Sequence, residues 1–263
     1  MDRPARARRS CHAVPGTSER FLAKAPSLDA DEFLLDLEDA AARDEKEQAR
    51  ASVIEALRTL DFGGRTVAVR VNATDTPHYY RDLIAIVEQA GAHLDTVIVP
   101  KVRTPGDVEM TAKLLTQIEL TCNLEPQRIG IEAQIEDASG LVACEAIALA
   151  SPRLEALIFG PGDYSAAVGI PGTTIGAAPE GYPGDHLNYV YSKILVAARA
   201  AGIQAIDGPY GLIDDGDVIT VRFTPYRAPR SATRTIRRAA RRLASSTSSP
   251  SSRIAPSSAA RIC

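Results

Sequence analysis

The chain has 263 residues, of which 45% are hydrophobic and 24% are charged, and its formal net charge is −3. This length allows one large α/β domain or two small ones, and the composition is ordinary for a soluble globular protein. The sequence lacks a run of about 18 apolar residues, which excludes a membrane-spanning helix. The arginine-rich amino terminus is not followed by an apolar segment, so we expect no secretory signal and a cytoplasmic protein.

Charge is distributed unevenly along the chain. From Asp217 to the end there are ten Arg, no Lys and one acidic residue, a charge of +9, which leaves −12 (−3 − 9) for residues 1–216. An Arg-, Ser- and Pro-rich segment of this kind buries too little apolar surface to offset its ordering entropy. We therefore expect a folded domain at 1–216 and a tail at 217–263 that is disordered or the product of a shifted reading frame.

The basic tail is also consistent with nucleic-acid binding. It contains no aromatic residue after Tyr226 on which a base could stack, so we expect no nucleic-acid partner.

Neither the cysteines nor the histidines have the spacing of a metal site. The cysteines lack C-x-x-C spacing, so we interpret them as reduced packing residues of a cytoplasmic protein. The histidines are equally isolated, and surface or core positions are expected for them. These residues are Cys11, Cys122, Cys144 and Cys263, and His12, His78, His93 and His186.

Short apolar strand patterns alternate with helix-length segments along most of the chain. The first strand pattern, Ser10–Val14, stops at Pro15-Gly16, and Thr17 or Ser18 is expected to cap the helix that follows. Further strands are expected at Phe33–Asp36, Thr66–Val71, Thr96–Pro100 and Gln204–Asp207, with two more inside Ile129–Tyr164.

Capping signals mark the starts of the later helices. The expected starts are Asp44, with Glu47 in capping-box spacing, Thr76-Pro77 and Thr104-Pro105, each with Pro at the first helical position, and Asp185.

Seven strand–helix alternations favour an α/β fold of the (β/α)₈ TIM-barrel type over a doubly wound sheet. The absence of a glycine-rich phosphate-binding fingerprint after the first strand weakens the dinucleotide-binding alternative. Beyond Asp217 the strand pattern is lost, so we expect the barrel to be incomplete at its eighth unit.

The segment Ile129–Tyr164 carries two acidic residues at corresponding places. Glu136 follows its first strand pattern, and Asp163 lies just past the second. Because neighbouring parallel strands end at the same edge of a sheet, we expect the two carboxylates to face one small volume. Mg²⁺ is commonly held by one or two carboxylates together with water and substrate oxygens. The spacing therefore suggests a metal-assisted enzyme.

Several motifs in order along residues 8–214 resemble the HpcH/HpaI aldolase and citrate lyase β-subunit superfamily. The last two of them resemble its malyl-CoA lyase subgroup. The motifs are R-R-S-C-H-A-V-P-G at Arg8–Gly16, S-x-R-F-L-x-K-A at Ser18–Ala25, L-D-L-E-D-A at Leu35–Ala40, V-R-V-N at Val69–Asn72, V-P-K at Val99–Lys101, Q-I-E-D-A at Gln134–Ala138, F-G-P-G-D-Y at Phe159–Tyr164, Y-P-G-D-H at Tyr182–His186 and A-I-D-G-P-Y-G at Ala205–Gly211.

The resemblance implies a TIM barrel that reversibly cleaves β-hydroxyacyl-CoA thioesters such as malyl-CoA to acetyl-CoA and glyoxylate, with Mg²⁺ or Mn²⁺ as cofactor. It also implies a homo-oligomer and a lid segment after the seventh strand that supplies an acidic residue. Here G-L-I-D-D-G-D at Gly211–Asp217 begins that segment, and the match then ends.

The resemblance also implies roles for individual residues. Glu136 and Asp163 would bind the metal, and Glu38 and Asp39 would orient metal-bound water. Arg70 would stabilise the enolate or the substrate carbonyl. Arg20 and Lys24 would contact the phosphates of coenzyme A. Asp207 is expected to touch the substrate.

Other interpretations remain open. Glu136 and Asp163 are also consistent with solvated carboxylates at strand ends, and Arg70 with a structural partner of Glu38 or Asp39. Arg20 and Lys24 are also consistent with an ordinary solvated helix face. Citramalyl- or citryl-CoA cleavage and malyl-CoA thioester hydrolysis would use the same metal site. A catalytically impaired remnant that still binds coenzyme A is the alternative outside the active enzymes.

Overall fold

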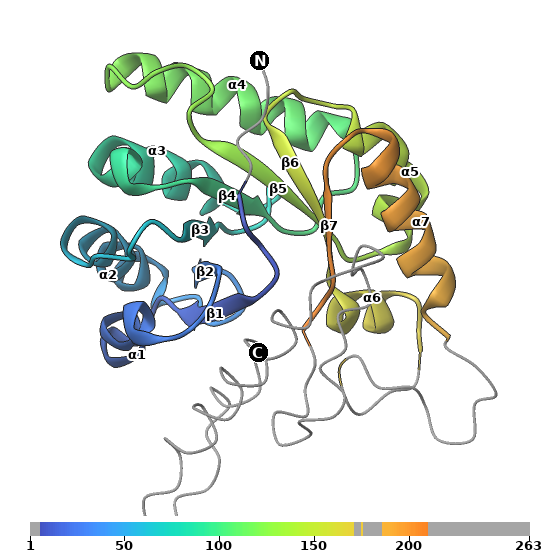
Figure 1. The fold of residues 1–263 in the computed structure, drawn as a ribbon, viewed down its shortest axis with the longest axis horizontal. Helices are drawn as coiled ribbons and strands as arrows, with labels where there is room; N and C mark the ends of the chain where they lie inside the picture. Colours follow the sequence, from blue (N-terminus) through green and yellow to red (C-terminus); the bar gives the residue numbers. More distant parts are fainter. Residues whose placement is uncertain (1–5, 171–174, 176–185, 210–263) are drawn as a thin grey trace, which may run out of the picture.

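The computed structural model describes residues 6–170, 175 and 186–209. Within them, seven strands form one parallel sheet in which every strand lies beside its neighbours in the sequence. Figure 1 shows that this sheet is curled, with β1 in blue and β7 in orange at its two edges. The strands are β1 (Cys11–Pro15), β2 (Glu32–Asp36), β3 (Thr66–Arg70), β4 (Thr96–Val99), β5 (Gly130–Ile135), β6 (Leu154–Phe159) and β7 (Gln204–Ile206).

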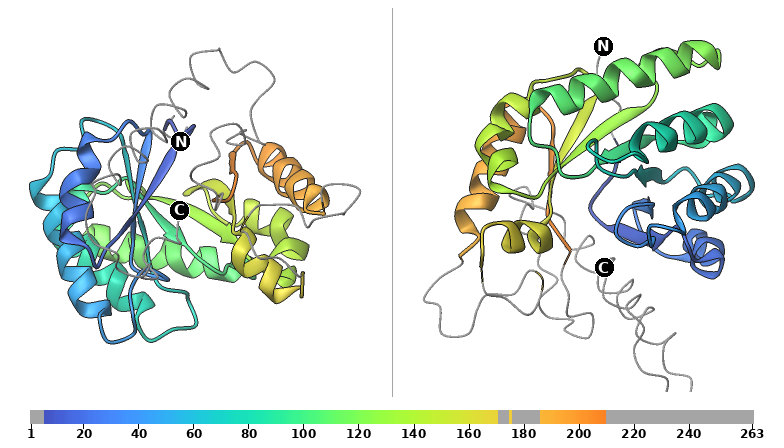
Figure 2. Two further views of the ribbon diagram at one scale, coloured as in Figure 1. Left: turned by 90° about the horizontal axis from the view of Figure 1, so that it is seen from below. Right: turned by 180° about the vertical axis from the view of Figure 1, so that it is seen from behind.

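Helices follow the strands and cover the outer, convex face of the sheet (Figures 1 and 2). The α-helices are α1 (Glu19–Lys24), α2 (Lys46–Thr59), α3 (Tyr79–Ala90), α4 (Pro105–Thr121), α5 (Ala138–Ala148), α6 (Pro161–Ala167) and α7 (Asn188–Ala200), with 3₁₀ turns η1 (Ala25–Ser27) and η2 (Gly91–His93). The main apolar core lies between the sheet and these helices; Phe33, Leu35 and Phe159 are fully buried in it. None of the described helices is both long and apolar enough to cross a bilayer.

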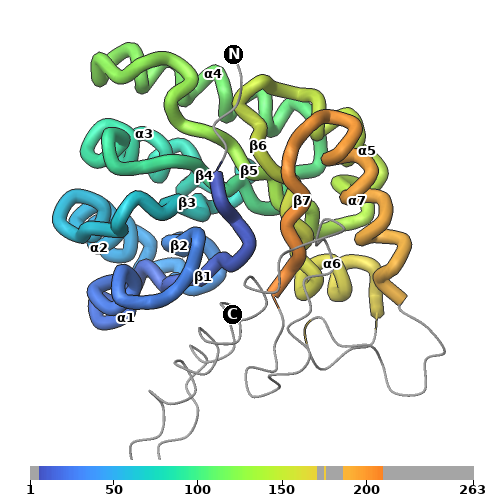
Figure 3. The backbone as a smooth tube through the Cα atoms, viewed as in Figure 1, coloured from blue at the N-terminus to red at the C-terminus, as the bar shows by residue number. Residues whose placement is uncertain are grey.

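The predicted strand–helix alternation is confirmed as a parallel α/β fold, and the described strands make a curled half-barrel. The backbone trace in Figure 3 runs steadily from β1 to β7 around this curve. Because β1 and β7 remain the edges of the described sheet, the closed eight-stranded ring is not seen there. The predicted eighth unit and the tail at 217–263 lie outside the described residues.

Two helix starts agree with the capping signals. The Ser18 hydroxyl accepts a hydrogen bond from the Phe21 N–H at the start of α1. Thr104 and Asp107 form a capping box at the start of α4, directly before Pro105. Both signals are local, so the tertiary fold leaves them unchanged.

Two other helix starts differ from the prediction. The predicted capping box at Asp44 and Glu47 is wrong, because α2 begins after Glu45 and no side chain caps it. Helix α3 begins at Tyr79, later than Pro77, because its N-cap is His78, whose carbonyl accepts the Asp82 N–H at 2.9 Å. Asp185, the predicted cap of α7, lies outside the described residues.

Side chains alternate between the two faces of each strand. Those on the concave face of the sheet therefore form three levels along the strands: at the amino ends, in the middle and at the carboxyl ends. A small apolar cluster of Ala68, Ile98 and Ile158 fills the middle level. On the same face, polar side chains lie at both ends of the strands. Glu32 and Glu132 are near the amino ends, and Asp36 and Arg70 are at the carboxyl ends.

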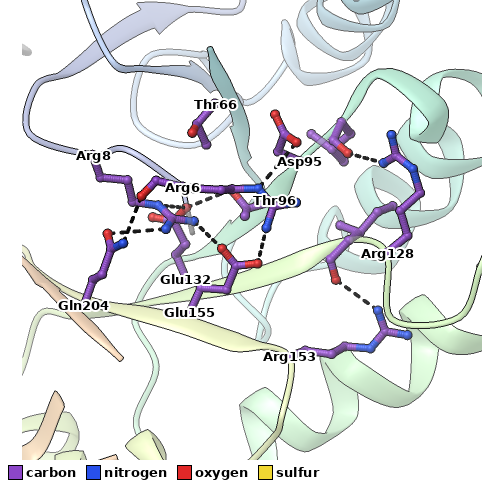
Figure 4. A network of polar contacts seen from close by, with 12 residues as sticks. Arg6, Arg8, Thr66, Asp95, Thr96, Arg128, Glu132, Arg153, Glu155 and Gln204 are labelled. Carbon is purple, nitrogen blue, oxygen red and sulfur yellow. Dashed lines mark hydrogen bonds and ion pairs between the residues drawn. The ribbon is translucent and has the colours of Figure 1, made fainter. Parts of the chain in front are cut away.

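The residues before β1 close the amino-terminal end of the half-barrel (Figure 4). The buried Arg8 guanidinium lies 3.0 Å from Glu132 and 2.6 Å from Glu155. Arg6 pairs with Glu155, and the Gln204 side-chain amide donates to the Arg6 carbonyl at 2.9 Å. These contacts tie the start of the chain to β5, β6 and β7, so the amino-terminal end is a structural network, and the carboxyl end remains for chemistry.

Candidate active site

At the carboxyl end of the sheet, Arg70 is held by a residue on the neighbouring strand. Asp36 and Arg70 are register partners in β2 and β3, and both side chains are buried. Arg70 donates through Nε and Nη2 to the two Asp36 oxygens at 2.8 and 2.7 Å. Its Nη1 lies 3.3 Å from Glu38 Oε2. This fork geometry fixes the plane of the guanidinium and leaves N–H groups for a further acceptor.

The turn after β2 is anchored on both sides. The Asp36 carboxylate accepts the N–H groups of Glu38 and Ala40 at 2.9 and 3.2 Å. The Lys46 ammonium donates to the carbonyls of Leu37, at 2.8 Å, and of Glu38. Burial lowers the pKa of Lys46, although nearby carboxylates such as Asp36 oppose this. Glu38 and the adjacent Asp39 are thereby presented to the strand ends by a turn of fixed shape.

Lys101, just after β4, contacts most of the acidic residues at this edge. Its ammonium lies 2.6 Å from Glu38 Oε1, 3.0 Å from Asp163 Oδ2 and 3.8 Å from Asp39 Oδ1. Its backbone N–H donates to Glu136 Oε1 at 3.0 Å. The backbone is in the left-handed region, with φ of 54°, a conformation that non-glycine residues adopt rarely.

Glu136 follows β5 and is almost completely buried, with 4% of its surface exposed. Its carboxylate lies directly against Gly160, where an added Cβ would be 2.7 Å from Oε2. Burial raises the pKa of Glu136 to about 8, the charges of Glu38 and Asp163 add to this rise, and the Lys101 N–H and Arg70 oppose it. Glu136 therefore takes up a proton at a higher pH than an exposed glutamate does, mainly because its carboxyl is buried.

Oxygen ligands for a divalent cation converge here. Glu38, Asp39 and Asp163 can each offer a carboxylate oxygen, all within 4.8 Å of one another. Hard oxygen donors such as carboxylates suit Mg²⁺ or Mn²⁺. The predicted ligands Glu136 and Asp163 do lie at one edge of the sheet, but the tightest group of oxygens contains Glu38 and Asp39 rather than Glu136.

The remaining predicted residues lie outside this cluster. Arg20 and Lys24 are exposed on α1, and neither side chain forms an ion pair with another described residue. The Arg20 guanidinium lies over the Phe21 ring, 5.0 Å from its centroid. Asp207 follows β7, is half-buried, and accepts the Gly208 N–H at 2.8 Å.

Sequence reasoning missed two members of the site. The strand pattern predicts Asp36 only as the end of a strand, although its register opposite Arg70 follows from aligning the two strand ends. Lys101 lies within the V-P-K motif, and the signal that could have found it is the position of a cation at the carboxyl end of a barrel strand.

Comparisons with known proteins place the chain in a family. The pattern of the HpcH/HpaI aldolase/citrate lyase family matches residues 9–221. The chain belongs to this family. It is 38% identical over 223 residues to the L-malyl-CoA/beta-methylmalyl-CoA lyase of Cereibacter sphaeroides, covering 81% of this chain and 70% of that protein. It is 33% identical over 238 residues to the malyl-CoA/beta-methylmalyl-CoA/citramalyl-CoA lyase of Chloroflexus aurantiacus, covering 84% and 68%.

A solved structure has the same fold. The CitE protein of Mycobacterium tuberculosis in complex with magnesium and acetoacetate superposes with a TM-score of 0.65 at 28% identity, covering 89% of this chain and 91% of that one. The family resemblance expected from the motifs is thus confirmed, and this member belongs to a family of enzymes that break or form carbon–carbon bonds.

Proposed function

We propose that the protein is a Mg²⁺-dependent lyase that cleaves, or forms, a β-hydroxyacyl-CoA such as malyl-CoA, with acetyl-CoA and glyoxylate as the products. The observation that carries this proposal is the convergence of Glu38, Asp39, Glu136 and Asp163 with the buried Arg70 at the carboxyl edge of the sheet. Relatives named as malyl-CoA lyases support the choice of substrate class.

The metal would be held by Glu136 and Asp163, with Glu38 and Asp39 beside it to bind or orient its water ligands. When bound, a divalent cation supplies Lewis-acid stabilisation of negative charge on oxygen. Mn²⁺ has the same preference for carboxylate oxygen and is expected to replace Mg²⁺.

The cleavage is a retro-Claisen reaction. The 3-hydroxyl group loses its proton, the C2–C3 bond breaks, and its electron pair moves to C2 and on to the thioester oxygen as an enolate. The aldehyde leaves as glyoxylate, and a proton returned to C2 gives acetyl-CoA. The Arg70 N–H groups that Asp36 and Glu38 leave unused would donate to the thioester oxygen as its charge develops.

Two further sites would bind the rest of the substrate. Arg20 and Lys24 are exposed cations on α1, the helix that follows β1 at this end of the sheet, and would meet the phosphates of coenzyme A. Asp207, at the end of β7, would lie close enough to the strand ends to contact the acyl group. We further propose that the working protein is a homo-oligomer in the cytoplasm.

A second candidate function differs from the first in the acyl group of the substrate. The relative from Chloroflexus aurantiacus is named for citramalyl-CoA as well as malyl-CoA. Citramalyl-CoA carries one more methyl group at the reacting carbon and would use the same cluster and Arg70, with pyruvate as the product in place of glyoxylate.

The test is to incubate the purified protein with malyl-CoA or citramalyl-CoA and Mg²⁺ and to measure glyoxylate or pyruvate. We expect product with the metal present, none with EDTA, and a loss of at least about 10²-fold in kcat for Asp163→Ala. Asp44→Ala is the matched control, because Asp44 is an exposed carboxylate without a hydrogen bond or ion pair among the described residues. Full activity of Asp163→Ala, or activity that EDTA does not change, would overturn the proposal.

A further inference from the structure

Lys101 joins both sides of the acidic cluster. Its ammonium is within ion-pair distance of Glu38, on the turn after β2, and of Asp163, on α6 after β6. Its backbone N–H holds Glu136, which follows β5. One residue after β4 thus contacts acidic side chains from three other strand–helix connections.

The Lys101 ammonium lies among carboxylates that could hold a metal ion. It lies between oxygens of the same three residues, Glu38, Asp39 and Asp163, that could together ligate a metal ion. A positive charge there lowers the repulsion between carboxylates that would otherwise face one another. Lys101 is only partly buried, with 32% of its side chain exposed, so the ammonium can swing away from one partner toward solvent.

The backbone conformation of Lys101 is unusual, which indicates that the surrounding contacts hold this residue in place. It is one of three non-glycine residues with positive φ in the described part of the chain, and the other two, Asn123 and Gln127, lie between α4 and β5, away from the cluster. Strained conformations persist where the surrounding contacts over-determine them. At Lys101 these contacts are the N–H bond to Glu136 and the ion pairs of the ammonium.

We propose that the Lys101 ammonium is the built-in counter-ion of this site: it holds Glu38 and Asp163 together before the divalent cation arrives and then yields Asp163 to it. The inference rests on the proposed metal site. It adds that the Lys101 ammonium competes with the metal ion for the same carboxylates. Because the ammonium and the metal ion repel each other at a separation of a few ångströms, Lys101 also sets an upper limit on the affinity for the metal.

The proposal predicts an unusual result, in which removing a side chain from the site strengthens metal binding. Lys101→Met should bind Mn²⁺ about tenfold more tightly than the wild type, because the competing charge is gone while methionine keeps the backbone N–H that holds Glu136. Without metal, the same variant should melt at a lower temperature, because the carboxylates lose their counter-ion.

The experiment measures free Mn²⁺ by electron paramagnetic resonance during titration of the full chain, and thermal melting in EDTA. Lys101→Arg keeps the charge and should bind Mn²⁺ like the wild type, which separates charge from substitution. Lys113→Met is the matched control for net charge, because Lys113 is exposed on α4 and forms no ion pair with another described residue. Lys101→Gln repeats the neutral substitution if the Met variant does not fold.

Tighter Mn²⁺ binding by Lys101→Met or Lys101→Gln together with unchanged binding by Lys101→Arg supports the proposal. Unchanged or weaker binding by the neutral variants overturns it, as does a wild-type protein that binds no Mn²⁺. The proposed lyase reaction is tested separately by product formation. If the neutral variants bind more tightly and no acyl-CoA is cleaved, the proposed function is wrong and the counter-ion inference stands.

Discussion

At the scale of single residues, the proposed role of Arg70 depends on the fork geometry of its guanidinium as well as on its charge. Two of its nitrogens are taken by Asp36 and one lies near Glu38, so the orientation of the remaining N–H groups is set before any substrate binds. Lysine would keep the charge but could not make the two parallel hydrogen bonds. A guanidinium aimed by a neighbouring strand is the arrangement that transition-state stabilisation needs.

Arg70→Lys is therefore expected to lower kcat for malyl-CoA cleavage by roughly 10²-fold, with a smaller change in KM. Steady-state kinetics with thermal melting would check this, since Asp36 loses part of its pairing. Arg103→Lys serves as the control, because Arg103 is half-exposed and pairs with Asp137 outside the cluster. A variant that is folded and retains the wild-type kcat would remove Arg70 from the mechanism.

Only part of the arrangement of these side chains follows from the sequence. Placing Glu38, Asp39, Arg70, Glu136 and Asp163 at one edge required only strand ends and the family motifs. Which carboxylates approach most closely depends on how far each connection folds over the strand ends. This is a tertiary property, so the grouping of Asp39 with Asp163 ahead of Glu136 does not follow from the sequence.

At the scale of elements, the connection from β6 to α6 is built to leave room for Glu136. A Cβ on Gly160 would lie 2.5 Å from Glu136 Cγ, which is closer than such atoms can approach. Glu136 is fixed on its other side by the Lys101 N–H, so it has little freedom to move away. The glycine is thus required by the close packing of β5 against the start of α6.

Gly160→Ala is expected to displace the Glu136 carboxylate and to reduce kcat on the order of 10²-fold, since displacements of about 1 Å at an active site have effects of that size. Gly106→Ala is the matched control, because its added Cβ would meet nothing nearer than the Thr104 hydroxyl at 3.4 Å. Activity assays and Mn²⁺ titration would report the effect. Unchanged activity and metal affinity in Gly160→Ala would show that the Glu136 position is not critical.

Helix starts that depend on local signals were predictable from the sequence, and a start that depends on tertiary contacts was not. The starts of α1 and α4 were predictable because Ser18 and Thr104 cap them through bonds within a few residues. The start of α2 was not, because Lys46 at its first position donates to carbonyls of the β2–α2 connection and so depends on how that connection folds.

At the scale of the whole molecule, the network at the amino-terminal end adds a pH dependence to stability. Glu32 is fully buried there beside Arg8, Glu132 and Glu155. Burial, with the nearby charge of Glu132, raises the pKa of Glu32 well above its usual 4.5, although Arg8 opposes this. The folded protein therefore keeps a proton that the unfolded chain releases, and stability from this group declines as pH rises from about 4.5 toward the folded pKa.

Glu32→Gln should remove this decline. The variant is expected to match the wild type near pH 4 and to exceed it in free energy of unfolding at neutral pH, with a gap that grows between the two conditions. Urea denaturation of both proteins across this range measures the gap. A difference that is constant with pH would mean that Glu32 does not hold a proton in the folded state.

The overall arrangement was predictable up to the seventh strand. The 2.0- and 3.6-residue periodicities identified each strand–helix unit, and a parallel sheet follows from their alternation. Closure of the ring depends on an eighth unit beyond Pro209, outside the described residues. The tie from Arg6 and Arg8 across to β5, β6 and β7 was not predicted, because it joins residues far apart in the sequence.

The proposed chemistry depends on one divalent cation that binds between carboxylates from different strand ends of this sheet. Anomalous diffraction from crystals soaked in Mn²⁺, recorded above the manganese absorption edge, tests it most directly. The account predicts a single strong peak between Asp163 and Glu136 or Glu38, with the Lys101 ammonium withdrawn from Asp163. A peak elsewhere, or no peak at Mn²⁺ concentrations that support turnover, would contradict it.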